Sequence, residues 1–432
     1  MSRSPQGSPG GYGFAVLVVT LAAYAALAVG YVTRTPIWQN PDEPAHFNYV
    51  AFVADTGGLP ELRPGDWDLA LLERLKNGTL QPSDSVASIR YESWQPPLFY
   101  LAAAPVYRLG PTSDTTAVVL RLRAFDAVLG ALTLGLGYLV AREVLGTQVA
   151  VFVPAAIVGV PMFTAVAAAV SADPLANLLA AAALLPLVRR MRRSVRGVTW
   201  PVATGALIGI GILTKLALAI FVPLAVAVIV ARSSRARRES VLLIGTIALV
   251  VAPWLVHQVT TYGWADPFAL SRHAAVVQDQ LRFPGLSSDY VGAFLTTTFH
   301  SFWAQFGWMA IVAPTRLYWA WGLLTLAALV GLVVRQRHRL AEPTWRLLAG
   351  VVLTSIAAYI GYNLSFEQFQ GRYLFTALVP IAILLVAGWA AWLPARLAPW
   401  GLALITGLLI ALNAYALVRV LGPGFAGFAL IG

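Results

Sequence analysis

The segment GFAVLVVTLAAYAALAVGYVTRTPIWQNPDEPAHF, residues 13–47, decides the fold. Its apolar run 14–32 is long enough to cross the hydrocarbon core of a bilayer as a helix. Two acids, Asp42 and Glu43, and an imidazole, His46, follow soon after this run ends. The chain therefore places a compact polar cluster close to the point where it leaves the membrane.

Composition extends this view to the whole chain. The 432 residues are 58% hydrophobic and only 11% charged, with a mean hydropathy of +0.72. A soluble surface requires more charge than this, so the sequence predicts an all-α, multi-pass membrane protein. The sequence contains no cysteine, which excludes disulfides, thiolate nucleophiles, cysteine zinc sites and lipoprotein acylation. The net charge of +11 lies in short basic clusters between apolar runs, which indicates membrane topology rather than nucleic-acid binding.

Eleven apolar runs predict about eleven transmembrane helices. They are 14–32, 117–140, 149–170, 174–188, 201–214, 216–231, 241–256, 308–334, 347–363, 373–393 and 399–421. Three basic connectors, 189–196, 232–238 and 335–340, are expected in the cytoplasm. Counting crossings from them places the amino terminus inside, and the carboxy terminus and the two large loops, 33–116 and 257–307, outside. The same map brings Asp42, Lys215 and Arg372 to one face of the membrane. The runs 201–214 and 216–231 are short for full crossings, so a hairpin with Lys215 at its tip is an alternative.

The domain organisation follows from this map. We expect a disordered cytoplasmic tail at 1–13, a transmembrane module at 14–395, and a final span with an external carboxy terminus at 396–432. Loop 33–116 carries ten of the nineteen acids, which indicates an external functional module rather than a linker. Residues 67–78 have helical spacing and end at Asn77-Gly78, a typical C-cap. Residues 91–109 are expected to form an aromatic helix at the membrane interface.

The polar cluster allows two readings. Asp42 and Glu43 precede and adjoin Pro44, so either could cap the start of a helix. Alternatively, a partly desolvated carboxylate at this boundary could act as a base with a raised pKa. Glu43 and His46 could orient that base, or together bind a divalent cation such as Mg²⁺ or Mn²⁺. A histidine beside a carboxylate is also commonly just hydrogen-bonded.

An acidic pair after the first span resembles the GT-C superfamily of integral-membrane glycosyltransferases, which includes protein O-mannosyltransferases and bacterial aminoarabinose transferases. PDEPAHF, 41–47, and QGRYLFTALVP, 370–380, resemble a bacterial GT-C-like group of multi-pass proteins. YESWQPPLFYLAAAPVY, 91–107, is similar to the first-loop element of the superfamily. SADPLANLLAAAALLPL, 171–187, and GALIGIGILTKLALAIFVPLAV, 205–226, resemble a span and a hairpin of it. Unlike some members, these 432 residues are not expected to include a large soluble carboxy-terminal domain.

The resemblance implies transfer of a sugar, with inversion, from a polyprenyl-phosphate donor to an acceptor hydroxyl at the outer face of the bacterial plasma membrane. The acceptor could be a glycan, a lipid or a protein. Asp42 would be the base, with Glu43 as a second catalytic residue. The expected donor-phosphate ligands are Lys215, Arg372 and Tyr373, and the expected substrate-binding residues are His46, Trp94, Gln95, Asp173 and Gln370.

Structural explanations remain open for several of these residues. Lys215 could extend its amine to water, and Arg372 could anchor a helix at the interface. Asp173 and Ser171 could cap the helix that follows, and Arg123 could pair with Asp126. A polymerase or ligase of lipid-linked oligosaccharides is one rival function. A transporter or flippase of envelope glycolipids is another, although it predicts internal repeats, which the sequence does not show.

Overall fold

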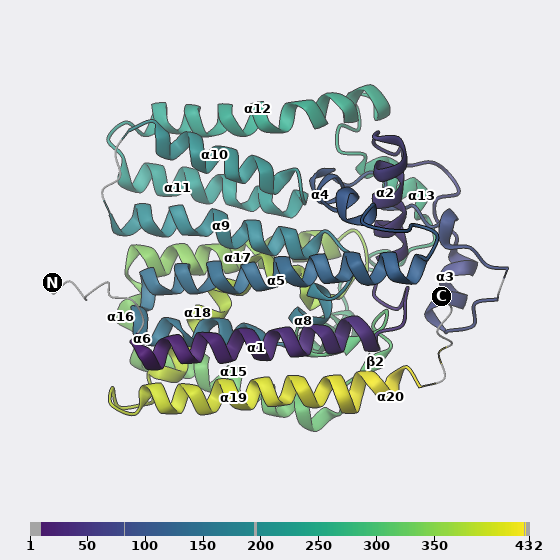
Figure 1. Ribbon diagram of the computed structural model, residues 1–432. Coiled ribbons are helices and arrows are strands. Elements are labelled where there is room, and N and C mark those ends of the chain that lie inside the picture. The colour runs from purple at the N-terminus through teal and green to yellow at the C-terminus, as the bar shows by residue number, and fades with distance from the viewer. Residues whose placement is uncertain (1–9, 82, 194–196, 427, 429–432) are drawn as a thin grey trace.

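The computed structural model describes residues 10–81, 83–193, 197–426 and 428. Within this range the protein is a helical bundle whose long helices run side by side (Figure 1). Eight helical segments are long and apolar enough to cross a membrane. They are α1 (Gly11–Arg34), α5 (Thr115–Leu145), α9 (Asp173–Arg192), α12 (Ala236–Tyr262), α15 (Thr315–Arg335), α17 (Pro343–Asn363), η3 with α18 (Gly371–Ala377, Leu378–Ala390), and α19 to α20 (Ala398–Ala416, η4 at Leu417–Leu421, Gly422–Gly424). The prediction of an all-α, multi-pass membrane protein is confirmed.

A bent pair of helical segments gives a ninth crossing only if it is counted as one broken span. It consists of α6 (Thr147–Ala150) and α7 (Phe152–Val158), followed by α8 (Pro161–Ala167) after a bend of 71°. Pro161 cannot donate a backbone hydrogen bond, and it forces Val160 into an extended conformation, so the helix cannot continue through it. The carbonyl of Val158 accepts a bond from Asn413 Nδ2 on α19, which also donates to Thr164 Oγ1. The run 149–170, predicted as one span, therefore contains two helical segments, α6 with α7 and then α8, joined at an angle.

The two predicted runs that are short for full crossings, 201–214 and 216–231, form two short helical segments. They are α10 (Thr199–Ile212) and the pair η2 and α11 (Leu216–Ile220, Phe221–Arg232), with Lys215 between them. This matches the expected hairpin with Lys215 at its break. Length and composition support eight spans, or nine with the bent pair, in the described part of the chain, so the count of eleven is not confirmed.

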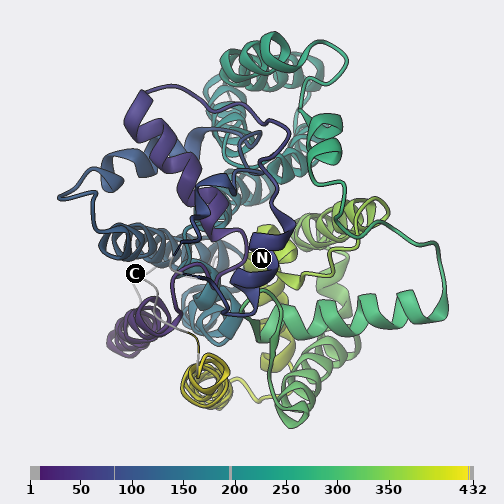
Figure 2. The ribbon, with the colours of Figure 1, turned by 90° about the vertical axis from the view of Figure 1, so that its right-hand side faces the viewer.

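Most of the short elements lie at one end of the bundle, which we call the loop end, formed by residues 35–114 and 263–314. Figure 2 looks onto this end, and the first of these segments crosses in front of the helices. The elements are α2 (Glu43–Thr56), α3 (Leu69–Lys76), η1 (Val86–Ser88), α4 (Leu98–Tyr107), α13 (Leu270–Val276), α14 (Ser288–Trp303), and the paired strands β1 (Gln305–Phe306) and β2 (Ile311–Val312). At the opposite end lies α16 (Arg337–Leu340) (Figure 1).

The loop end has a hydrophobic core of its own. Leu62, Leu72, Phe99 and Tyr100 are fully buried in it, so the first loop is a packed unit. The helix expected near 67–78 is α3, with the side chain of Asp68 capping its start and Asn77 at its C-cap. The helix expected over 91–109 is shorter and packs against α2 through buried side chains.

Some expected features fall on residues that are not described. The tail expected at 1–13 lies mostly outside the described residues, and α1 begins at Gly11. The same holds for the end of connector 189–196 and for most of the last six residues of the chain.

The two ends of the bundle should face opposite sides of the membrane. The basic clusters at the end of α9, the start of α12 and α16 share the end away from the loops. Single cysteines at the exposed positions Glu61 and Leu286 should react with an impermeant maleimide on intact cells. Cysteines at Arg237 and Arg337 should react only after permeabilisation, and labelling of either on intact cells would contradict this orientation.

Candidate active site

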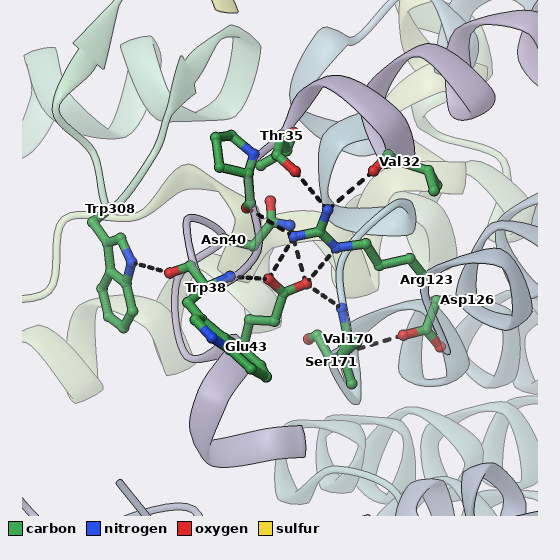
Figure 3. A network of polar contacts seen from close by, with 11 residues as sticks. Val32, Thr35, Trp38, Asn40, Glu43, Arg123, Asp126, Val170, Ser171 and Trp308 are labelled. Carbon is green, nitrogen blue, oxygen red and sulfur yellow. Dashed lines mark hydrogen bonds and ion pairs between the residues drawn. The ribbon is translucent and has the colours of Figure 1, made fainter. Parts of the chain in front are cut away.

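A buried ion pair organises the loop end. Arg123, on α5, faces Glu43, the first residue of α2, in a two-pronged arrangement (Figure 3). Arg123 Nε lies 2.7 Å from Glu43 Oε1, and Nη2 lies 2.6 Å from Oε2. Both side chains are 0% exposed. A buried pair of this kind is tolerable only when the remaining donors and acceptors are also satisfied.

The remaining donors of Arg123 are satisfied by the end of α1. Its Nη1 donates to the carbonyls of Val32 and Thr35, and its Nη2 to that of Pro36. These include carbonyls at a helix end that have no partner within the helix. Arg123 therefore fixes the path of the chain from the first span into the loop.

The carboxylate of Glu43 is equally saturated. It accepts from the backbone N–H groups of Trp38 and Val170 and from Asn40 Nδ2. The carbonyl of Trp38 is in turn held by Trp308 Nε1 at 2.9 Å (Figure 3). Three segments that are distant in sequence, around residues 38–43, 123 and 170, thus meet at the carboxylate of Glu43, the neighbour of Asp42.

Asp42 does not cap α2, although it occupies the N-cap position. Its backbone is in the left-handed region, with φ 67°, which is uncommon for residues other than glycine. Its Oδ1 accepts from the hydroxyl of Tyr91 at 2.8 Å, and its Oδ2 accepts from Arg372 Nη2 at 2.5 Å. Its side chain therefore faces two functional groups rather than the helix end.

Four charged residues alternate in sign from Asp42 onward. Arg372 also lies 3.5 Å from Asp173, measured from Nη1 to Oδ2. Lys215 Nζ donates to the other oxygen of Asp173. We call Asp42, Arg372, Asp173 and Lys215 the charge chain. The sequence map placed Asp42, Lys215 and Arg372 on one face, and the structure brings them together.

Each member of the charge chain lies where a helix begins or breaks. Asp173 is the first residue of α9, Lys215 separates α10 from η2, and Arg372 lies in the 3₁₀ turn η3. Gly371 allows this turn to approach α14, because a Cβ there would lie 2.3 Å from the carbonyl oxygen of Thr298. Asp173 does not cap α9; instead, Ser171 Oγ accepts from its backbone N–H.

Aromatic rings and amides surround these charges. Lys215 Nζ and the guanidinium of Arg372 lie 5.6 and 5.5 Å from the ring centroid of Tyr373. Gln370 Oε1 accepts from Arg372 Nε at 2.6 Å. His46 shares a 2.8 Å hydrogen bond with the hydroxyl of Tyr100.

The two remaining predicted substrate-binding residues lie at the side of the site. The ring of Trp94 packs against His273, on α13, with centroids 5.0 Å apart. The carbonyl of Gln95 accepts from the hydroxyl of Tyr49. These contacts hold the two residues in place, and binding roles for Trp94 and Gln95 remain predictions.

Burial and neighbouring charges shift the pKa values of Asp42 and His46. Burial alone would raise the pKa of Asp42, but the charge of Arg372, followed by His46 and by hydrogen bonds from Arg372 and Tyr91, holds it below its ordinary value. This is opposite to the raised pKa that the sequence suggested. Burial lowers the pKa of His46 to about 4, so its imidazole is neutral at pH 7.

Two site residues were missed in the sequence. The first is Tyr91, whose hydroxyl donates to Asp42. The second is Glu92, whose pKa is raised to about 7, mainly by burial and then by the charge of Asp42. Glu92 Oε2 is shielded from solvent and has no hydrogen-bond partner within the described residues. An acid among the aromatic residues of 91–107 was a signal that could have been used.

The expected Arg123–Asp126 pair is wrong: Arg123 pairs with Glu43, and Asp126 accepts from the N–H of Ser171.

The metal expected at Glu43 and His46 does not fit these contacts. Both oxygens of Glu43 are bound by Arg123, and His46 Nδ1 is bonded to Tyr100. Within the described residues no group of three or more histidine, cysteine, aspartate or glutamate side chains could hold a metal ion.

Comparison with known proteins identifies the fold. A family model described as dolichyl-phosphate-mannose-protein mannosyltransferase matches residues 95–257, less than half of the chain. The structure superposes on ArnT from Cupriavidus metallidurans in the apo state with a TM-score of 0.58 and 18% identity, covering 91% of this chain and 63% of that one. The same protein bound to undecaprenyl phosphate gives 0.57 and 17%, covering 97% and 74%. The chain has the GT-C fold.

A second protein has a similar fold. The Archaeoglobus fulgidus oligosaccharyltransferase, tethered to an acceptor peptide, gives a TM-score of 0.51 and 13% identity, covering 95% of this chain and 54% of that one. The chain thus spans only 63% of apo ArnT and about half of the oligosaccharyltransferase. No curated protein sequence matches it.

Removing one partner of the Glu43–Arg123 pair should unfold the loop end of this GT-C fold. Arg123→Met leaves a buried carboxylate without its countercharge, at a cost of about 3–5 kcal/mol. The double variant Glu43→Met/Arg123→Met should recover part of this loss. The partly exposed Arg74, which pairs with Asp84, offers a control: Arg74→Met should cost only about 1 kcal/mol. Unfolding in detergent measures all three, and strictly additive losses in the double variant would contradict the pairing.

The raised pKa of Glu92 makes a separate prediction. Folded protein holds this proton up to about pH 7, whereas the unfolded chain loses it near pH 4.5, so the stabilisation present below pH 4.5 is lost as pH rises toward 7. Glu92→Gln should therefore stabilise the protein relative to wild type at pH 8, on the order of 1–3 kcal/mol, and hardly at pH 5. Thermal unfolding of both proteins from pH 5 to 8 measures the difference. A difference that is constant with pH would exclude the raised pKa.

Proposed function

We propose that the protein is a glycosyltransferase that moves one sugar from a polyprenyl-phosphate donor to an acceptor hydroxyl. The charge chain within a GT-C fold carries this proposal, because it sets a carboxylate base beside two cations. In the proposed reaction Asp42 takes the proton of the acceptor hydroxyl, and the acceptor oxygen bonds to the anomeric carbon from the opposite side. The bond from that carbon to the phosphate oxygen breaks, and its electron pair remains on the lipid phosphate.

Lys215 and Arg372 are suited to receive that developing charge. Arg372 presents a planar fork that can bind two phosphate oxygens, and Lys215 adds a point charge on the other side of Asp173. Tyr373 borders both cations, and Gln370 fixes Arg372 through its Nε. His46, Trp94 and Gln95 are assigned to the wall that receives the sugar or the acceptor.

Apolar side chains border Arg372. A small cavity reaches from Arg372 along apolar side chains of α8, among them Met162, Ala165 and Val166. An isoprenoid chain needs such an apolar wall next to the cation that binds its phosphate. ArnT, which shares the fold, has been crystallised with undecaprenyl phosphate.

Glu43 is assigned a supporting part. It holds the segment that presents Asp42, and its own oxygens are saturated by Arg123 and by three other donors. We place the loop end, and with it the reaction, on the outer face of the plasma membrane. The basic clusters at the opposite end support this orientation.

The decisive experiment is transfer of a labelled sugar from polyprenyl monophosphate by the purified protein in nanodiscs, with cell-envelope extract as acceptor. Asp42→Asn should lower turnover about 10²–10⁴-fold through loss of the base. Asp55→Asn, an exposed acid on the same helix, is the matched control and should retain activity.

Other outcomes separate the rivals. Full activity in folded Asp42→Asn would exclude its role as base. Transfer of oligosaccharide blocks would favour a polymerase or ligase, and movement of the lipid across the bilayer without transfer would favour a flippase.

A further inference from the structure

The carboxylate of Asp173 lies between the two cations of the site. One of its oxygens accepts from Lys215 Nζ, and the other faces Arg372 Nη1 at 3.5 Å. All three side chains are largely buried, with 12%, 24% and 6% exposure for Asp173, Lys215 and Arg372. A carboxylate with one oxygen on each cation imitates two oxygens of a phosphate.

The charge chain is neutral as it stands. Two carboxylates, Asp42 and Asp173, balance Lys215 and Arg372. Arg372 directs Nε to Gln370, Nη2 to Asp42 and Nη1 to Asp173, so each of its three nitrogens already faces an oxygen. A lipid phosphate that entered would bring negative charge to a charge chain whose two cations are both already paired. One carboxylate must give up its place before these cations can bind a phosphate.

Asp173 is the carboxylate that can leave. Asp42 is held on its other oxygen by Tyr91, and its backbone follows the segment pinned by Glu43 and Arg123. Within the described residues, the carboxylate of Asp173 is bonded only by Lys215 and Arg372, and it does not cap its own helix. Its displacement therefore breaks no contact except those that the phosphate would replace.

We propose that Asp173 is an internal substitute for the donor phosphate. Between turnovers it keeps Lys215 and Arg372 in place, since two unpaired cations in this poorly hydrated site would be costly. The phosphate displaces it on binding, and its return helps to expel the polyprenyl phosphate product. Asp173 is thus a positioning residue that lowers phosphate affinity in exchange for product release. This inference rests on the proposed function.

The test is binding of polyprenyl phosphate alone, without sugar or acceptor, to the protein in nanodiscs. Asp173→Asn removes the competing charge but keeps the size of the side chain, so the lipid should bind at least about tenfold more tightly. Inorganic phosphate should also compete better for the site in this variant. In transfer assays both KM for the donor and kcat should fall, because the product leaves slowly.

Controls keep the result interpretable. Asp289→Asn removes an exposed acid of the loop end and should leave lipid binding unchanged. Asp173→Glu keeps the charge and should bind the lipid no more tightly than wild type. If Asp173→Asn does not fold, Asp173→Ser should show the same tightening, since serine is well accepted at a helix start.

The outcomes distinguish this inference from the proposed function. Unchanged or weaker lipid binding in a folded Asp173 variant overturns the inference, even when the wild type transfers sugar. Tighter binding in the variant supports it, even when no sugar transfer is found and the proposed function fails.

Discussion

The buried contact between Glu43 and Arg123 is the constraint on which the site depends. Loop 33–116 leaves the first span and would otherwise have many conformations, at an entropic cost for every residue that is ordered. One ion pair removes that freedom at the membrane boundary. It is completed by backbone groups from α1, from the segment between α1 and α2, and from the segment before α9. The pair is fully desolvated, so it is stable only as a complete network, and loss of any donor exposes the others to the same cost.

The charge chain inherits its geometry from this network. Asp42 directly precedes Glu43, and Asp173 follows Val170, whose N–H is bound by Glu43. The network therefore sets the spacing between the two carboxylates, and Arg372 spans that gap with two of its nitrogens. Glu43, which does not itself take part in the proposed reaction, thereby controls where Asp42 and the proposed phosphate-binding cations lie.

Much of this arrangement could be predicted from sequence, for identifiable reasons. Basic connectors fix sidedness, so Asp42, Lys215 and Arg372 could be assigned to one face without a structure. The partner of Arg123 could not be predicted, because local spacing favours Asp126, whereas the true partner, Glu43, lies 80 positions away. The lowered pKa of Asp42 could not be predicted for the same reason, because it depends on contact with Arg372, which is distant in sequence. The break at Pro161 was readable from the proline, but a long apolar run concealed it.

The site lies at breaks in helices because of the solvent that surrounds them. In a bilayer, irregular backbone and charged side chains are tolerated only where protein or a polar cavity satisfies them. Pro161 opens such a break, and Asn413, from the last long helix, satisfies the carbonyl of Val158 that the break exposes. The chain then turns toward Asp173 with its backbone held by Glu43 and Asp126. Polar residues from the start, the middle and the end of the chain thus meet at one boundary, where protein groups pair their charges.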